Sequence, residues 1–362
     1  CALAMAREGV SLTVVEQAAA FGEVGAGLQL GPNAVRVLHE WGLGDALSAC
    51  AAFPETLRVR DARTSHTLGQ MPLGSAMLAR YGQRYATVHR ADLHRLLLEA
   101  VQARPQVRLM LDTRLAHVES NAEAVRLTTE GGEVFTCDAI IGCDGLWSRV
   151  RQALLGAAPA RPTGHLAYRG MVPSRDMPIG LRGSAVTAWL GPRLHVVHSP
   201  VRGGAWFNVV AVVHGVLGQG HGDPVESWHH EAHLSDLKRA LGPVSTSLRE
   251  VVEAVPEWKL WALHDRPPVR GPQGHAQGRM ALLGDAAHPM RPYLAQGAAM
   301  ALEDAWSLGR ALMHQPGALA DPAPLLRAWA EQRWPRNAWV QARSQRNGRI
   351  FHLLPPMSWG RN

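Results

Sequence analysis

One stretch, residues 280–304, holds a carboxylate and a helix start in an order that can bind a polar ligand. Residues 280–283 form a short apolar run, typical of a buried parallel strand, and Gly284 and Asp285 end it. From Gly297 a helix is predicted, and its small residues allow close approach to the backbone. A carboxylate that faces a helix N-terminus accepts hydrogen bonds from hydroxyls, and the helix dipole favours electron-rich atoms. Asp285 and this helix start therefore predict the two ends of one ligand site.

Two further stretches have strand patterns that end in an acidic residue. Residues 10–16 predict a strand that ends in Glu16, and residues 1–9 before it predict the end of an amphipathic helix. Residues 139–142 predict a buried strand that runs into Asp144 and Gly145. Taken alone, Glu16 can be a solvated charge at a strand end, and Asp144 can bond its own backbone in a tight turn.

Taken in order, the three stretches resemble the cofactor-binding motifs of the single-component FAD-dependent aromatic hydroxylases, a group that includes salicylate, 3-hydroxybenzoate and 6-hydroxynicotinate hydroxylases. The likeness covers nearly the whole chain. It implies an α/β fold in which a Rossmann-like FAD-binding domain is joined to an antiparallel-sheet substrate domain, as in para-hydroxybenzoate hydroxylase. The Gly-rich phosphate turn that opens such a domain is not in the sequence, so we expect a truncated N-terminus and, from family length, a short C-terminus.

The resemblance assigns cofactor contacts to these motifs. Glu16 is expected to bind the ribose hydroxyls, and Asp285, after Gly284, the ribityl chain. Gly297 and Ala298 are expected to present N–H groups to the N1/O2 edge of the flavin, where negative charge develops on reduction.

Four further residues are implied by the same resemblance. Asp144 is expected to orient groups around the cofactor and has a link to nicotinamide binding, and the backbone of Leu115 is expected near the adenine. Arg90 can contact the pyrophosphate in a forked geometry, although an ion pair with Asp92 at the helix start is the alternative. Gln29 can reach the cofactor or the substrate.

The family's flavin is reduced by NADH or NADPH and captures O₂ as a C4a-hydroperoxide, which hydroxylates an aromatic carbon. A residue must then hold the substrate hydroxyl or remove its proton, and histidine titrates in the right range. His195 and His198 lie an odd number of residues apart on a predicted strand, so only one can face the site. By resemblance His195 matches a catalytic histidine, whereas Ser199 stands where relatives often carry tyrosine. His195 is therefore predicted as base or substrate anchor.

The loop before the predicted helix supplies two more candidates. Pro292 is expected to shape the floor of the site near flavin C4a, and Tyr293 either touches the substrate or simply packs. His288 fits a loop-stabilising role better than that of a base.

The predicted elements divide the chain into an FAD-binding domain, a substrate domain and a C-terminal helical segment. Their ranges are 1–55, 87–160 and 266–325 for the first, 56–86 and 161–265 for the second, and 326–362 for the third. Strand-like runs between residues 165 and 214 favour an antiparallel sheet. Helices are predicted over residues 224–241 and, despite Pro335, over residues 325–348. Asn33 is a competent N-cap for a helix that reaches Trp41.

Composition narrows the class of protein. The chain has 362 residues, 46% of them apolar, which is enough for a large core. Its net charge of +7 comes almost entirely from arginines, which are scattered and do not form the stripe expected of a nucleic-acid surface. We interpret this excess mainly as coding bias, with some benefit for an anionic cofactor and substrate. No apolar run is long enough to cross a bilayer, and the four cysteines lack metal-ligand spacing. We therefore expect a cytoplasmic protein without a membrane partner or a metal. The sequence leaves open whether it forms a homodimer.

The sequence leads to one main hypothesis and two alternatives. The main hypothesis is an FAD-dependent monooxygenase that uses NAD(P)H and O₂ to hydroxylate a small anionic aromatic, such as a hydroxybenzoate or salicylate. One alternative is hydroxylation of a heterocyclic or larger phenolic substrate on the same fold. The other is an inactive, truncated flavoprotein homologue.

Overall fold

The computed structural model of the chain describes residues 1–22, 26–156, 158–215, 230–315, 317 and 320–353. The chain divides into two compact units, each assembled from three stretches. Unit 1 consists of Cys1–Gly22, Arg95–Arg161 and Asp265–Ser344, and unit 2 of Glu23–His94, Pro162–His264 and Gln345–Asn362. The domain boundaries expected from the sequence stay a prediction.

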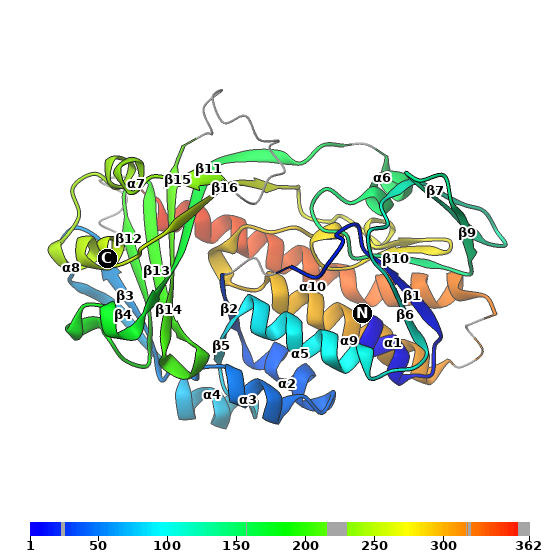
Figure 1. Ribbon diagram of the computed structural model, residues 1–362, viewed down its shortest axis with the longest axis horizontal. Coiled ribbons are helices and arrows are strands. Elements are labelled where there is room, and N and C mark those ends of the chain that lie inside the picture. The colour runs from blue at the N-terminus through cyan, green and yellow to red at the C-terminus, as the bar shows by residue number, and fades with distance from the viewer. Residues whose placement is uncertain (23–25, 157, 216–229, 316, 318–319, 354–362) are drawn as a thin grey trace. The chain divides into compact units, whose positions relative to one another are not determined.

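Unit 1 combines small sheets with helices (Figure 1). Its strands are β1 (Leu12–Val15), β6 (Val107–Met110), β7 (Leu115–Ser120), β8 (Val125–Thr129), β9 (Val134–Cys137), β10 (Ile140–Gly142), β17 (Ala276–Gln277) and β18 (Met280–Leu282). Its helices are α1 (Ala2–Arg7), α6 (Arg149–Leu155) and α9 (Gly297–His314), with α5 (Arg90–Gln102) and α10 (Pro322–Phe351) crossing into unit 2. The pairs β1–β6 and β10–β18 are parallel, as a Rossmann-like unit requires, whereas β7, β8 and β9 form an antiparallel meander.

Close packing joins the predicted strand over residues 139–142 to the helix that follows it. A Cβ atom on Gly142 would lie 2.7 Å from the Cβ of Val150 in α6 and 2.8 Å from a methyl of Leu282 in β18. Only glycine therefore lets α6 pack directly against these strands. The buried cluster that results consists of Val150, Leu154, Leu282, Ala286 and Ala287.

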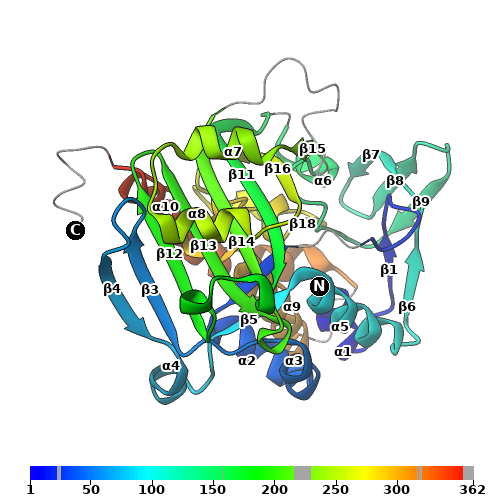
Figure 2. The same cartoon turned by 60° about the vertical axis from the view of Figure 1, so that its left-hand side comes forward.

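Unit 2 is built on an eight-stranded sheet in the order β15-β16-β11-β14-β13-β12-β3-β4 (Figure 2). These strands are β3 (Thr56–Asp61), β4 (Thr67–Pro72), β11 (Arg161–Pro173), β12 (Ala185–Gly191), β13 (Leu194–Val201), β14 (Trp206–His214), β15 (His230–Ala232) and β16 (Trp258–Asp265). Strands β11, β14, β13 and β12 pair antiparallel in turn, and β12 pairs in parallel with β3. Among the described residues, no helix is both long and apolar enough to cross a membrane.

One face of this sheet carries the apolar core of unit 2. Helices α7 (Leu234–Leu241) and α8 (Thr246–Glu253) lie on it (Figure 2), where Leu237, Leu248 and Val251 are fully buried. The strand residues in the same cluster include Leu166, Tyr168, Val196, Phe207, Val209 and Ala211. Because side chains alternate along a strand, the residues between these point to the opposite face.

The remaining elements of unit 2 are short. They are α2 (Pro32–Glu40), α3 (Gly44–Cys50), α4 (Gly74–Tyr81), the antiparallel pair β2 (Gly27–Leu30) and β5 (Ala86–His89), and the 3-10 turns Ser174–Asp176, Ile179–Leu181 and Arg202–Gly204. The backbone of Gly27 approaches Asn208 so closely that a Cβ atom would lie 2.5 Å from the Asn208 Cβ.

Two local predictions are wrong. Asn33 is not the N-cap, because Gly31 occupies that position and Pro32 starts the helix, where a missing N–H is tolerated. The helix expected over residues 224–241 begins only at Leu234, after the strand β15, and residues 224–229 lie outside the described residues. The helix predicted from Gly297 and the long helix through Pro335 are confirmed by α9 and α10.

Candidate active site

The strand, turn and helix predicted around Asp285 are present in unit 1. After β18, Gly284 adopts a left-handed backbone conformation with φ of 56°. A Cβ atom there would lie 3.1 Å from the Cβ of Ala301 in α9, so glycine is required both for the conformation and for the close approach. The 3-10 turn Gly284–Ala286 that follows leaves Asp285 exposed.

The carboxylate of Asp285 lies beside the start of α9. Its Oδ1 is 4.0 Å from the position that a Cβ atom on Gly297 would take. The first intrahelical bond runs from Met300 N–H to the Gln296 carbonyl, so the N–H groups of Gly297 and Ala298 lie before it. The structure therefore brings together Gly284, Asp285, Gly297 and Ala298, as the sequence predicted.

A buried carboxylate that the sequence analysis did not single out holds this turn in place. Asp304, in α9, is fully buried, and its Oδ2 accepts from Gly284 N–H at 3.1 Å and lies 2.5 Å from His288 Nε2. Its Oδ1 accepts from Arg333 at 2.9 and 3.0 Å and from Asn337 at 3.0 Å. Burial alone would raise the pKa of Asp304, but these partners hold it well below its usual range.

The loop between this turn and α9 is tied to α10. Gln341 donates to the Pro289 carbonyl at 3.0 Å, and Ser344 donates to the Arg291 carbonyl. Pro292 is exposed, whereas Tyr293 is buried, and this burial raises the pKa of its phenol. Both roles predicted for Tyr293, contact with the substrate and packing, stay predictions.

The other two motifs of unit 1 also make local bonds. One oxygen of Glu16, just after β1, accepts from Ala18 N–H at 2.8 Å. The Glu16 carbonyl accepts from Thr113 N–H, close to Leu115, where β7 begins. Asp144 accepts from Arg149 and Val150 N–H at 2.7 and 3.2 Å, so it binds the first two N–H groups of α6, whose N-cap is Ser148. Bonding to neighbouring backbone, the structural role open to Asp144, is therefore present.

Gln29 and Arg90 belong to unit 2. Gln29, in β2, accepts from the Tyr85 hydroxyl at 2.6 Å. Arg90 is exposed at the first position of α5, and its N–H donates to the Ala26 carbonyl. The carboxylate of Asp92 accepts from Arg202 at 2.8 Å, which gives it a partner other than the one the sequence suggested.

His195 lies on the face of the unit 2 sheet opposite the apolar core, with its ring only 4% exposed. Its Nδ1 is 2.8 Å from His352 Nε2, and the ring of Phe351 is 5.7 Å away between centroids. Burial, and then nearby His165, lowers the pKa of His195 to about 3. The ring is therefore neutral at neutral pH. His198 points to the other side and lies against Trp189.

Alternation along the strands places two more polar residues on the His195 face. Ser199, four residues along β13, is 1% exposed, and its hydroxyl has no hydrogen-bond partner in the described part of the chain. Arg169, in β11, pairs with Val210 of β14, which in turn pairs with Val197 of β13. Arg169 therefore lies on the same sheet face as Val197, His195 and Ser199. Its Nε also lacks a partner among the described residues, and burial, followed by Arg90, lowers its pKa to about 10.

Unit 1 also carries a groove of about 500 Å³ rich in arginine. Four of its lining residues are Arg151, Arg161, Arg266 and Arg270, and none of the lining residues is acidic. Arg151 donates at 2.9 Å to the carbonyls of both residues that follow Asp285. Burial, and then Arg266, lowers the pKa of Arg151 to about 10, so two cations share the groove without a carboxylate in its wall.

Comparison with known proteins places this geometry in a family. A model of the FAD binding domain matches residues 1–344. The chain is 37% identical to a 3-hydroxybenzoate 6-hydroxylase of Klebsiella oxytoca, over 97% of this chain and 85% of that protein. It is 35% identical to a 6-hydroxynicotinate 3-monooxygenase of Bordetella bronchiseptica, over 95% of this chain and 86% of that protein.

The chain belongs to the FAD-dependent aromatic hydroxylases. A solved structure agrees with this family assignment: Klebsiella pneumoniae HpxO, complexed with FAD and uric acid, superposes with a TM-score of 0.83 at 25% identity. The match covers 99% of this chain and 87% of HpxO. The fold and the FAD cofactor predicted from the motifs are thereby confirmed.

The residues of this hydroxylase fit FAD at unit 1. The space beside Gly297 meets only the Asp285 carboxylate, and only at 4.0 Å, so a ligand can approach the helix tip. The Asp304 network was missed because its partners are 16 to 33 residues away in sequence. A signal was nevertheless present, since Glu303 and Asp304 interrupt a run of apolar residues in a predicted helix.

Proposed function

We propose that this hydroxylase uses NAD(P)H and O₂ to hydroxylate a small anionic aromatic, such as a hydroxybenzoate. The observation that carries the proposal is the exposed Asp285 carboxylate beside the open tip of α9. Relatives named for 3-hydroxybenzoate and 6-hydroxynicotinate support the substrate class. Bound FAD would accept a hydride from the nicotinamide and activate O₂ for transfer of a hydroxyl group.

The chain would hold FAD with carboxylates and backbone groups. Asp285 accepts hydrogen bonds from ribityl hydroxyls, and the N–H groups of Gly297 and Ala298 stabilise negative charge on the reduced ring. Glu16 has one carboxylate oxygen engaged by Ala18 and can offer the other to a ribose hydroxyl. In the same proposal, contacts of Gln29, Arg90, Leu115 and Asp144 with the cofactor stay as predicted from the family.

His195 would anchor the substrate hydroxyl. As a neutral imidazole it can donate or accept one hydrogen bond through the nitrogen that does not face His352. The rings of Phe351 and His352 pack on it, which keeps water from the hydroxyl it binds. Pro292 would shape the floor near flavin C4a, as predicted from the family, and Tyr293 beside it would touch the substrate or pack in the loop.

Arg169 would bind the carboxylate of the substrate. It shares the sheet face of His195, is half-buried, and has a buried guanidinium nitrogen without a partner in the described residues. Its guanidinium also lies 4.9 Å from the centre of the Trp261 ring, which fixes its orientation. No ion pair joins Arg169 to a carboxylate in the described part of the chain, and an anionic ligand would stabilise such a cation, which would favour anionic aromatics.

NAD(P)H would dock its phosphates in the arginine-lined groove of unit 1. Four arginines and no acidic residue line the groove, and guanidinium groups bind phosphate in a bidentate geometry. Arg151 and Arg266 also donate to backbone carbonyls, which holds their positive charge at the groove. Arg151 connects the groove to the Asp285 turn through the carbonyls of Ala286 and Ala287. The co-substrate would therefore bind next to the turn that holds the flavin.

A heterocyclic phenol is the second candidate substrate. The relative named for 6-hydroxynicotinate favours it, because that compound also pairs a ring hydroxyl with a carboxylate. The buried Ser199 hydroxyl, without a partner in the described residues, can satisfy a ring nitrogen or a second hydroxyl.

The experiment that tests the function is a substrate panel on the FAD-loaded protein. Salicylate, 3- and 4-hydroxybenzoate and 6-hydroxynicotinate are each added with NADH or NADPH, and both NAD(P)H oxidation and hydroxylated product are measured. The proposal expects one of the acids to stimulate oxidation and to be converted into product. A protein that binds FAD but makes no hydroxylated product from any of them would refute it.

A further inference from the structure

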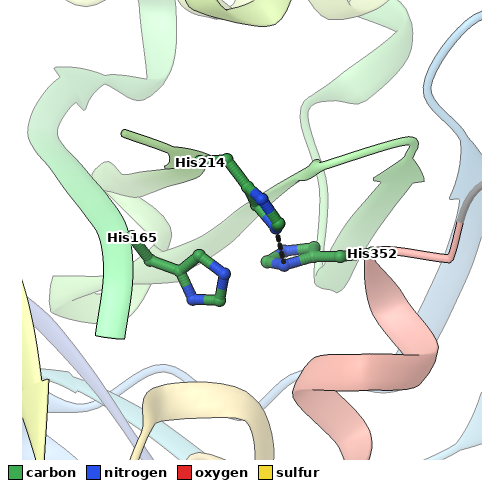
Figure 3. Close-up of side chains that lie close together, drawn as sticks. All are labelled: His165, His214 and His352. Carbon is green, nitrogen blue, oxygen red and sulfur yellow. Dashed lines mark hydrogen bonds between the residues drawn. The ribbon is translucent and has the colours of Figure 1, made fainter. Parts of the chain in front are cut away.

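Three histidines from distant parts of unit 2 come together at one end of its large sheet (Figure 3). His165 in β11 and His214 at the end of β14 are directly opposite each other in the antiparallel ladder. His352 follows the last residue of α10. One ring nitrogen from each of the three lies within 4.8 Å of the other two.

We infer that His165, His214 and His352 form a binding site for a divalent transition-metal ion such as Zn²⁺. Zn–N bonds of about 2.0–2.1 Å in a tetrahedron put neighbouring nitrogens roughly 3.3–3.4 Å apart. The distance between His214 Nε2 and His352 Nδ1 is 3.3 Å. Small rotations of the His165 ring would shorten the remaining distances, which are at most 4.8 Å. The metal would replace the proton that these two rings share.

The ligand set selects the kind of ion. Three neutral imidazoles suit Zn²⁺, Cu²⁺ or Ni²⁺, whereas Mg²⁺ and Ca²⁺ require oxygen ligands. His165 and His352 are 8% and 7% exposed, and His214 is exposed. The two buried rings would form the inner side of the site, and the exposed one would let an ion enter and leave a position for a water or an anion.

A histidine that binds a metal through one ring nitrogen usually donates a hydrogen bond from the other, and His195 would accept that bond from His352. With Nδ1 of His352 on the metal, its Nε2 must carry the proton and donate it to His195 Nδ1, 2.8 Å away. The bond orients the His352 ring. It also fixes His195 in the tautomer with a proton on Nε2, so the metal would influence the residue that we propose as substrate anchor. This last consequence rests on the proposed function, whereas the metal site does not.

Calorimetric titration of chelator-treated, FAD-loaded protein with ZnCl₂ tests the site without any turnover. We expect one Zn²⁺ per chain. His214→Ala is the decisive variant, because His214 is exposed and its loss leaves the core intact. Loss of a ligand should weaken binding by more than the roughly 100-fold that loss of an outer-shell partner costs. The matched control is His66→Ala, which removes an exposed histidine of unit 2 outside the cluster and should bind Zn²⁺ as the wild type does.

Thermal unfolding gives a second reading on the same proteins. Zn²⁺ that binds the folded state alone should raise the unfolding temperature of the wild type and of His66→Ala, and should not raise that of His214→Ala. Saturable binding with equal affinity in His214→Ala and the wild type would overturn the inference. So would a wild type that takes up no stoichiometric Zn²⁺.

Discussion

Replacement of Asp304 by asparagine removes one charge from the centre of unit 1 and preserves its shape. Oδ2 of Asp304 bonds Gly284 and His288, and Oδ1 accepts from Arg333 and Asn337. An asparagine keeps one acceptor oxygen and turns the other into an NH₂ group that faces N–H donors. In either orientation of the amide, its NH₂ group faces N–H donors that had bonded a carboxylate oxygen, so those donors lose their acceptor.

The size of the effect follows from burial. Removing one partner of a buried ion pair costs about 3–5 kcal/mol, because the other charge stays buried without compensation. Glu303 lies 3.2 Å from Arg333 and still neutralises part of its charge in the variant. We therefore expect a loss of unfolding free energy at the lower end of this range, about 3 kcal/mol. The variant should also lose FAD affinity, since the bond from Gly284 N–H to Asp304 holds the turn that carries Asp285.

Urea unfolding at fixed FAD and protein concentration measures this loss, and flavin content after purification measures the second effect. Asp236→Asn is the matched control, because Asp236 forms an exposed ion pair with Arg239 worth about 0.5 kcal/mol or less. Asp304→Asn protein that unfolds within about 0.5 kcal/mol of the control and keeps its flavin would refute the reasoning.

The pH dependence of the same pair of proteins checks the cause. The partners of Asp304 lower its pKa in the folded state. A carboxylate of this kind stabilises fully above its unfolded pKa of about 3.9, and that stability is lost as the pH falls toward the folded pKa. The difference in unfolding free energy between wild type and Asp304→Asn should therefore narrow below about pH 4. A difference that widens in acid would assign the effect to something other than the charge of Asp304.

Asp285→Ala should lower flavin content, while the free energy of unfolding of the FAD-free protein changes by no more than about 0.5 kcal/mol, since this carboxylate is exposed; full flavin retention would argue against its role. His195→Gln should reduce product formed per NAD(P)H oxidised more than it reduces FAD binding, and unchanged coupling would remove His195 from the site. Arg169→Gln should raise KM for an anionic substrate about 10-fold or more, because a charge-assisted hydrogen bond is lost. Equal KM values for the variant and the wild type would disprove the contact. Added Zn²⁺ should slow hydroxylation by the wild type and not by His214→Ala, because it fixes the His195 tautomer.

The features that the sequence predicted correctly depend on neighbouring residues. An apolar run, a glycine and then small residues define β18, the Gly284 turn and α9 without help from the rest of the chain. Asn33 shows the limit of this logic, because two local signals competed and the preference of Pro32 for the first helical position decided the helix start.

The features that the sequence did not predict depend on distant residues. His214 and His352 are 138 residues apart, and their meeting requires both the register of β14 and the end point of α10. Arg333 and Asp304 are brought together by the packing of α10 on α9, 29 residues apart in sequence. No spacing rule for short motifs covers such distances, so side chains that converge from separate elements emerge only from the folded structure.

The contrast between local motifs and side chains from separate elements suggests how members of the family come to differ in substrate. The contacts proposed for the flavin ring and the ribityl chain come from backbone groups and the Asp285 carboxylate of one local motif in unit 1, so they would change only if that turn changed. The contacts proposed for the substrate are side chains of unit 2, Arg169, His195 and Ser199, which project from one face of its large sheet. Each can be exchanged without altering the ladder that carries it. Relatives that share the FAD binding domain can therefore act on a hydroxybenzoate in one case and a hydroxynicotinate in another.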